Sequence, residues 1–161
     1  MGESPRVLAG KYLTFKLLGE SYGIDVMAVR EIVHHMAINE LTPMPCGICG
    51  AIHLRGHIVP VMDLCARCHP AGTLCDKENY IAVVQTALPA GKTATLGLMV
   101  DEMQEMVNIS GTDIENLAGY AGAMPANRLI GIAHLPGGVT ALLNPNGLVR
   151  QETWEELRHA A

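Results

Sequence analysis

Residues 50–64 read GAIHLRGHIVPVMDL, and this stretch decides the fold because it describes a complete β-hairpin. Hydrophobic residues dominate on both sides of Arg55-Gly56, and a two-residue turn that ends in glycine is typical of a tight hairpin. Glycine readily adopts the positive φ that such turns require, so Gly56 is assigned to the turn. Pro60 has no amide hydrogen and is expected at a sheet edge or a bulge. The stretch therefore predicts strands over 51–54 and 57–64.

Short apolar or alternating segments on both sides of this hairpin predict further strands, separated by glycine- and proline-rich turns. The predicted strands are 12–17 and 22–27 as one hairpin, 31–35, 79–85, 94–103, and 129–135 with 139–143 as a last hairpin. Residues 41–49, 65–78 and 116–128 are expected to be irregular, and 146–161 is expected to form a helix. About ten short strands at near-regular spacing are typical of a β-barrel or a β-sandwich.

The composition narrows the classes of protein to which the chain can belong. Its 161 residues suit one compact unit or two small lobes, and 49% hydrophobic with 17% charged residues argues against disorder. Aromatic residues make up only 4%, so the core must be mainly aliphatic. A net charge of -5 argues against binding to nucleic acid. The sequence shows neither a signal peptide nor an apolar run of membrane-spanning length, so we expect a cytoplasmic protein without membrane insertion.

Four pieces of the chain, in order, resemble the CheW domain of chemotaxis coupling proteins. Residues 50–64 match the family pattern G-x-x-x-L-R-G-x-x-x-P-V-x-D-L throughout, and this long match is the specific one. The others are shorter: residues 12–15 with 22–26 and 29–32, residues 97–103, similar to G-x-x-V-D-x-V, and residues 130–133 with 141–144. The family usually has Asp where Asn144 stands, a departure expected to weaken a local turn contact without altering the fold. Together the pieces cover about residues 11–150.

The resemblance implies an all-β fold of two intertwined five-stranded β-barrels of the SH3-like kind. We expect a CheW-like domain over 11–150, with two lobes that share one core, and a helical tail over 151–161. The implied function is that of a non-catalytic scaffold that couples chemoreceptors to a CheA-type histidine kinase. Its partners would be the regulatory domain of that kinase and the cytoplasmic tip of the receptor, and it would require no cofactor.

Six residues are candidates for partner binding: Val29, Glu31, Ile32, Gly50, Arg55 and Gly56. The first three match positions that the family places near receptor and kinase contacts, although a plain strand with apolar core residues and one solvated glutamate would look the same. Arg55 lies at the hairpin tip, where it can pair with a carboxylate on a partner or within the barrel. Gly50 is expected to permit close backbone approach beside the barrel mouth.

The cysteines are the feature that the family resemblance does not explain. Cys46 and Cys49 form one C-x-x-C motif, Cys65 and Cys68 form another, and fifteen residues separate the motifs, a spacing typical of tetrathiolate zinc sites. If residues 51–64 form a hairpin, its open ends bring the two motifs face to face. In the cytosol the five cysteines are expected to be thiols or metal ligands rather than structural disulfides. Thiols without a ligand, a structural zinc and a thiol redox switch all remain open.

Residues 65–69, Cys-Ala-Arg-Cys-His, also spell the attachment motif of c-type haem. Haem of that kind is normally attached outside the cytosol, and the barrel rim offers no obvious second axial ligand. A metal- or haem-dependent sensor or redox protein that uses the cysteine cluster is therefore the alternative function. A colourless protein with chemotaxis partners would favour the adaptor, whereas a metal-dependent response would favour the sensor.

Overall fold

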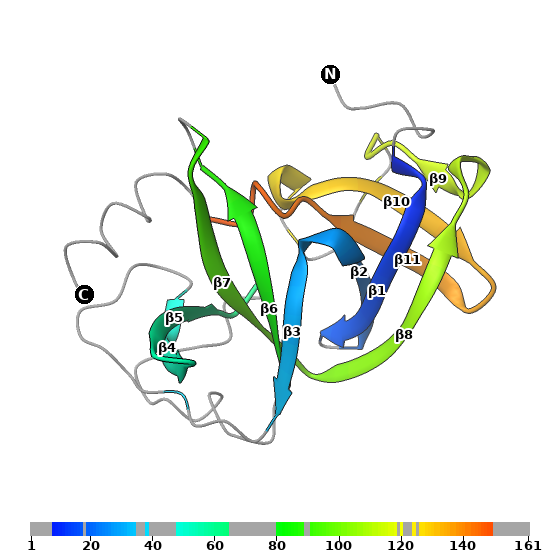
Figure 1. The fold of residues 1–161 in the computed structure, drawn as a ribbon. Coiled ribbons are helices and arrows are strands. Elements are labelled where there is room, and N and C mark those ends of the chain that lie inside the picture. The colour runs from blue at the N-terminus through cyan, green and yellow to red at the C-terminus, as the bar shows by residue number, and fades with distance from the viewer. Residues whose placement is uncertain are drawn as a thin grey trace. The chain divides into compact units, whose positions relative to one another are not determined.

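The computed structural model describes residues 8–17, 19–34, 38, 48–64, 80–88, 91–118, 120, 124 and 126–149. The chain divides into two compact units (Figure 1). Unit 1 combines the N-terminal segment 1–28 with residues 101–148, whereas unit 2 comprises 29–100 and 149–161. Each unit contains one β-sheet. The all-β class is therefore confirmed, and the two units interleave along the sequence.

Unit 1 is a six-stranded sheet in the order β8-β1-β2-β11-β10-β9. Its strands are β1 (Gly10–Leu17), β2 (Glu20–Asp25), β8 (Glu102–Ile109), β9 (Ile114–Glu115), β10 (Leu129–Leu135) and β11 (Gly138–Leu143). Neighbouring strands run antiparallel except β2 and β11, which are parallel. Short 3-10 helices separate some of the strands: η1 (Val26–Ala28), η3 (Gly111–Asp113) and η4 (Ala126–Arg128).

Unit 2 is a five-stranded sheet in the order β3-β6-β7-β5-β4. Its strands are β3 (Val29–His34), β4 (Ile48–Leu54), β5 (His57–Met62), β6 (Tyr80–Ala87) and β7 (Thr93–Val100). The pair β5 and β7 is parallel, and the other neighbours are antiparallel. Pro60 lies one residue before β5 begins to pair with β7 at Val61. Pro60 has no amide hydrogen to donate, but β5 is not yet paired with β7 at this position, so the β5–β7 pairing loses no hydrogen bond.

Both units use one topology. In each, a three-stranded antiparallel sheet joins a β-hairpin through a parallel pair of strands: β8-β1-β2 joins β11-β10, and β3-β6-β7 joins β5-β4. Along the chain, however, the hairpin comes last in unit 1 and between β3 and β6 in unit 2. The two units are thus circular permutations of one strand arrangement. Unit 1 differs from the predicted five strands only by the two-residue β9 at its edge.

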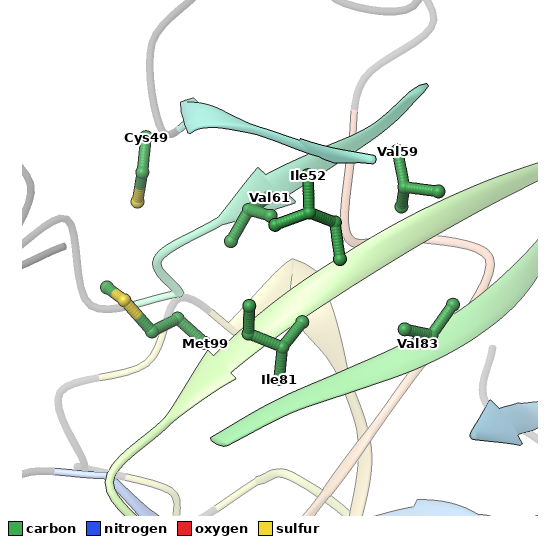
Figure 2. Close-up of a cluster of buried hydrophobic side chains, with 7 residues drawn as sticks. All are labelled: Cys49, Ile52, Val59, Val61, Ile81, Val83 and Met99. Carbon is green, nitrogen blue, oxygen red and sulfur yellow. The ribbon is translucent and has the colours of Figure 1, made fainter. Parts of the chain in front are cut away.

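Aliphatic side chains form the core of each unit, as the scarcity of aromatic residues predicted. In unit 2 the buried cluster contains Cys49, Ile52, Val59, Val61, Ile81, Val83 and Met99 (Figure 2). In unit 1 it contains Leu8, Tyr12, Ile109, Ile114, Ala133 and Leu142. Two of the aromatic rings pack against each other in unit 1. Phe15 and Tyr22 lie on neighbouring strands and stack with a centroid separation of 6.2 Å.

The structure corrects some of the predicted element boundaries. Residues 94–103 are not one strand, because β7 ends at Val100, the chain bends at Asp101, and β8 begins at Glu102. The strand predicted over 22–27 ends at Asp25, whose side-chain Oδ1 accepts a hydrogen bond from the Met27 amide at 2.9 Å. Such an Asx turn replaces the strand ladder. The predicted C-terminal helix falls mostly on residues 150–161, outside the described part of the chain.

Candidate partner interface

The tip of the β4–β5 hairpin is a two-residue turn with positive φ at both positions. Arg55 has φ +50° and Gly56 has φ +81°, which together correspond to a type I′ turn. Glycine tolerates this conformation, whereas an arginine with positive φ is uncommon, because its Cβ crowds the backbone. The assignment of Gly56 to the turn is confirmed. The sequence did not predict that Arg55 would share its conformation.

Arg55 pairs with Glu31 across the unit. The Arg55 Nε atom lies 3.1 Å from the Glu31 Oε2 atom, with the arginine side chain 78% exposed and the glutamate 28% exposed. These residues belong to opposite ends of the sheet, because Glu31 lies on edge strand β3 and Arg55 follows edge strand β4. Val33 of β3 and Leu54 of β4 also pack against the same buried cluster. The sheet of unit 2 therefore curls until its two edges meet at this ion pair.

A β-bulge shapes the strand that carries Glu31. Val29 pairs with Val84 and Glu31 with Val83, so Arg30 is an extra residue in β3. Arg30 is exposed, and its Nη2 donates a hydrogen bond to Gln85 Oε1. Bulges re-aim neighbouring side chains, and here the bulge leaves Glu31 facing the hairpin tip. This bulge and the contact from Arg30 were not predicted from the sequence.

The six candidate residues fall into two groups. Glu31, Arg55 and Gly56 meet at the hairpin tip, and Ile32, 41% exposed, follows Glu31 on β3. Val29 begins the same strand and is half-buried. Gly50, by contrast, is buried within β4 and pairs with Val61. The structure thus brings five of the candidates to one edge, while Gly50 lies near the open end of the hairpin.

The hairpin of unit 2 has a counterpart in unit 1 that sequence inspection missed. Residues 50–56 read GAIHLRG and residues 131–137 read GIAHLPG, and each stretch runs along the first strand of a hairpin into its turn. Each first strand also carries a bulge immediately before its glycine, at Cys49 in β4 and at Ile130 in β10. A search of the sequence for internal similarity at this short motif would have found the repeat.

Unit 1 has hollows beside its hairpin that are lined by both polar and apolar residues, and these too were not predicted. One of about 590 Å³ includes Lys16, Glu20, Glu115 and His134 in its lining. His134 Nε2 lies 2.7 Å from Glu115 Oε1, and both side chains are at least half exposed. Tyr120, also in this lining, accepts a hydrogen bond at its hydroxyl from the Met124 amide at 3.0 Å. The hollow thus holds one pair, His134 with Glu115, among both polar and apolar lining residues.

The cysteine prediction is tested at one position only. Cys49 is 8% exposed and belongs to the buried cluster of unit 2. It is disulfide-bonded, which corrects the expectation that it would be a thiol or a metal ligand rather than part of a disulfide. Its bonding partner and the other cysteines lie outside the described residues. Within the described part of the chain, no three His, Cys, Asp or Glu side chains are grouped to hold a metal ion. Whether the two C-x-x-C motifs bind zinc therefore stays a prediction.

Comparison with known proteins agrees with the fold. The family model described as the CheW-like domain matches residues 11–153. The protein named "Chemotaxis protein CheW" from Klebsiella aerogenes is 28% identical over 142 residues, 88% of this chain and 82% of that protein. Its namesake from Rhizobium meliloti is 24% identical and covers 89% of both chains. The crystal structure of scaffolding protein TtCheW from Thermoanaerobacter tengcongensis superposes with a TM-score of 0.73, at 28% identity, over 90% of this chain and 95% of that one.

Proposed function

Since this chain belongs to the CheW-like domain family, we propose that it is a non-catalytic adaptor that couples chemoreceptors to a CheA-type histidine kinase. The names of its relatives support a role in chemotaxis, and the likeness to TtCheW, a scaffolding protein, supports a scaffolding role. The proposed partners are the regulatory domain of the kinase and the cytoplasmic tip of the receptor. In such a protein the mechanism is geometric, since the adaptor holds its partners at fixed positions.

The observation that carries this proposal is the exposed Arg55 at the hairpin tip. Exposed ion pairs contribute only about 0.2–1 kcal/mol to stability, so the pair with Glu31 gives the fold little. Asparagine would fit this turn position better than arginine, because asparagine tolerates positive φ. An arginine in this place therefore costs conformational energy without a matching gain within the chain. A partner carboxylate that engages the guanidinium would supply the missing gain.

We place the contact surface on the tip residues Glu31, Arg55 and Gly56 with the neighbouring exposed Ile32. Ile58, on the second strand of the hairpin, is 57% exposed and adds apolar area beyond the tip. An exposed charge beside exposed aliphatic side chains suits a partner that brings both a carboxylate and an apolar patch. Arginines at the centre of interfaces often dominate the binding energy.

We propose the cytoplasm as the location, because chemoreceptor tips and their kinases meet there. Within the described residues, no helix is long and apolar enough to cross a membrane.

Binding to the purified partner fragments tests the function. The protein should bind a CheA-type regulatory domain and a receptor-tip fragment in titration calorimetry or pull-down. We expect Arg55→Asn to weaken at least one of these interactions by about 2 kcal/mol or more, the range of interface hot spots. Asparagine preserves the turn, so a loss of binding would not reflect a misfolded hairpin.

Lys92→Asn is the matched control, since it removes the same charge from an exposed position in the same unit. It should leave both affinities unchanged. If Arg55→Asn binds both fragments as tightly as the unmodified protein does, the tip is not the contact surface. If the unmodified protein binds neither fragment, the adaptor function itself is wrong.

A further inference from the structure

We propose that a hollow in unit 1 binds an arginine side chain that a partner protein supplies. The hollow has a volume of about 600 Å³, and its lining includes residues of strand β8 and of the turn between β10 and β11. All of its lining residues belong to unit 1, so the site is separate from the Arg55 tip of unit 2. The proposal therefore does not rest on the adaptor function.

The strand that borders the hollow repeats the strand that carries Glu31. Residues 23–33 read GIDVMAVREIV, and residues 97–107 read GLMVDEMQEMV. Both stretches run from a glycine at a parallel strand pair into an edge strand, β3 or β8. The identical pairs are Gly23 with Gly97, Val26 with Val100, Glu31 with Glu105 and Val33 with Val107.

Strand pairing confirms that Glu31 and Glu105 occupy matching places. Glu31 pairs with Val83 next to the bulge of β3, and Glu105 lies in the bulge of β8 opposite Thr14. Val83 and Thr14 are themselves equivalent, because each pairs with the glycine of the parallel strand pair in its unit. Each unit thus has a glutamate at the bulge of its edge strand.

The two units differ in what lies beside this glutamate. In unit 2 the Arg55 Nε atom lies 3.1 Å from the Glu31 Oε2 atom. The matching tip residue of unit 1 is Pro136, which carries no charge, and both Pro136 and Glu105 line the hollow. Among the described residues, no ion pair joins Glu105 to a basic side chain. The hollow therefore occupies in unit 1 the place that the Arg55 side chain fills in unit 2.

Lys16 also lines the hollow, but it corresponds to a different residue of unit 2. Lys16 and Gln85 are equivalent, since each comes two residues after the residue opposite the glycine. Gln85 accepts a hydrogen bond from Arg30, and Gln104 stands in β8 where Arg30 stands in β3. At this pair of positions each unit has one cation and one amide, on exchanged strands.

The charges of the two sites show what unit 1 lacks. Unit 2 has Arg30 and Arg55 around Glu31, whereas the lining of the hollow has only Lys16 and Glu105 as charged residues. One added cation makes the two sites alike. A guanidinium is the cation that the chain itself uses at the matching place, and its planar fork can bond a carboxylate through two N–H groups.

The rest of the lining suits an arginine presented by a protein segment. Val107, Leu135 and Pro136 offer apolar surface to the methylene groups of its side chain. Gln104 and Asn108 carry amide oxygens that can accept hydrogen bonds from the guanidinium. Strand β8 is an edge strand in which only the last residue is buried, and such an edge can receive an extended backbone.

Nuclear magnetic resonance titration of the full chain with a capped Leu-Arg-Gly peptide tests the proposal. We expect saturable shifts of backbone amides that line the hollow, such as those of Asn108 and Gly137, with a millimolar dissociation constant. The same peptide with citrulline in place of arginine keeps the shape but loses the charge. It should bind about tenfold more weakly, because charge-assisted hydrogen bonds are the stronger ones.

Two variants locate the carboxylate. Glu105→Gln should weaken binding of the arginine peptide by about tenfold. Glu102→Gln is the matched control, because it removes the same charge from an exposed position of β8 outside the lining, and it should bind like the unmodified protein. Absence of saturable shifts in the hollow, equal binding of the citrulline peptide, or arginine binding that survives Glu105→Gln would each overturn the proposal.

Pro136→Arg tests the equivalence of the two tips from the opposite direction. It gives unit 1 the tip residue of unit 2, so an arginine of the chain itself should compete for the hollow and weaken peptide binding severalfold. Unchanged binding would contradict the equivalence on which the proposal rests. None of these measurements involves the kinase or the receptor, so failure here would leave the adaptor function untouched.

Discussion

The β4–β5 hairpin of unit 2 and the β10–β11 hairpin of unit 1 are built alike but turn differently. Ile52 and Ala133 are both fully buried at matching positions, and Ile58 and Val139 are each 57% exposed. The tips diverge, because Arg55 has positive φ, whereas the ring of Pro136 fixes its φ near about −65°. Only the hairpin of unit 2 presents a guanidinium at its tip. The comparison teaches that this fold does not need an arginine there, which supports the proposal that Arg55 contacts a partner.

The largest effect on stability should come from truncating a buried side chain of the β4–β5 hairpin, which is larger than its counterpart in the β10–β11 hairpin. Ile52→Ala removes a fully buried side chain, and its counterpart Ala133 already has the smaller size. We expect the free energy of unfolding to fall by about 2–5 kcal/mol, measured by urea denaturation. Ile58→Ala, on the same hairpin but exposed, should change it by only about 0.5 kcal/mol. Equal losses from both variants would contradict the burial that the structure shows.

The next largest difference in stability is expected at the parallel strand pairs that join the hairpin to the rest of each sheet. These joints are β5–β7 in unit 2 and β2–β11 in unit 1. A methyl group on Gly97 would lie 2.8 Å from Ile81 Cγ2 and 3.3 Å from Val61 Cγ2, so Gly97→Ala overpacks the joint. We expect a loss of about 1–3 kcal/mol in thermal or urea unfolding. At Gly23 the nearest atom is Leu142 Cδ2 at 3.2 Å, the end of a flexible side chain, so Gly23→Ala should cost less. The reverse order would show that the two joints are not packed as described.

Exchanging the turn residues tests the comparison directly. Arg55→Pro imports the residue of unit 1 into a position with φ +50°, which proline cannot adopt, and should cost about 1 kcal/mol or more. Arg55→Asn fits the type I′ turn and should leave stability within about 0.5 kcal/mol, since the lost ion pair is exposed. Urea midpoints of both variants measure this. A tolerated proline would mean that the two turns interconvert freely.

The smallest effect is expected at the histidine that both hairpins share. His134 pairs with Glu115 at 2.7 Å on the surface of unit 1, and its counterpart His53 is exposed on β4. His134→Gln should lower the free energy of unfolding by less than about 1 kcal/mol, because both side chains of the pair are at least half exposed. His53→Gln is the control. A large loss at His134 would show that the pair is structural.

Local signals made much of the fold predictable. The hairpin over 50–64, the hairpin predicted from strands 12–17 and 22–27, and the last hairpin each combine apolar strands with a glycine-containing turn. All three hairpins are present, although the second strand of the hairpin nearest the N-terminus runs from Glu20 to Asp25. Strand β8 was missed because its pattern is irregular. A bulge opposite Thr14, whose hydroxyl donates a hydrogen bond to the Glu105 carbonyl at 2.6 Å, breaks the alternation on which strand prediction relies.

Asn144 shows how a departure from the family pattern can leave the local structure intact. Its Oδ1 accepts a hydrogen bond from the Asn146 amide at 3.1 Å, as a carboxylate oxygen could. The expected weakening of a turn contact is therefore not visible in the geometry. The substitution removes a charge but keeps the acceptor, and the acceptor is what the turn uses.

The sequence by itself determined the strands, the hairpin turns and the family, because side-chain alternation and turn chemistry depend on residues close together in the chain. It also identified Glu31 and Arg55 as separate candidates. Only the tertiary structure decided that these two meet, since the sheet of unit 2 must curl before its edge strands β3 and β4 approach each other. The parallel pairing of β2 with β11 and of β5 with β7 was likewise not predictable from the sequence. No local pattern says which distant edge will complete a buried sheet, because that choice depends on apolar surface buried by both partners together.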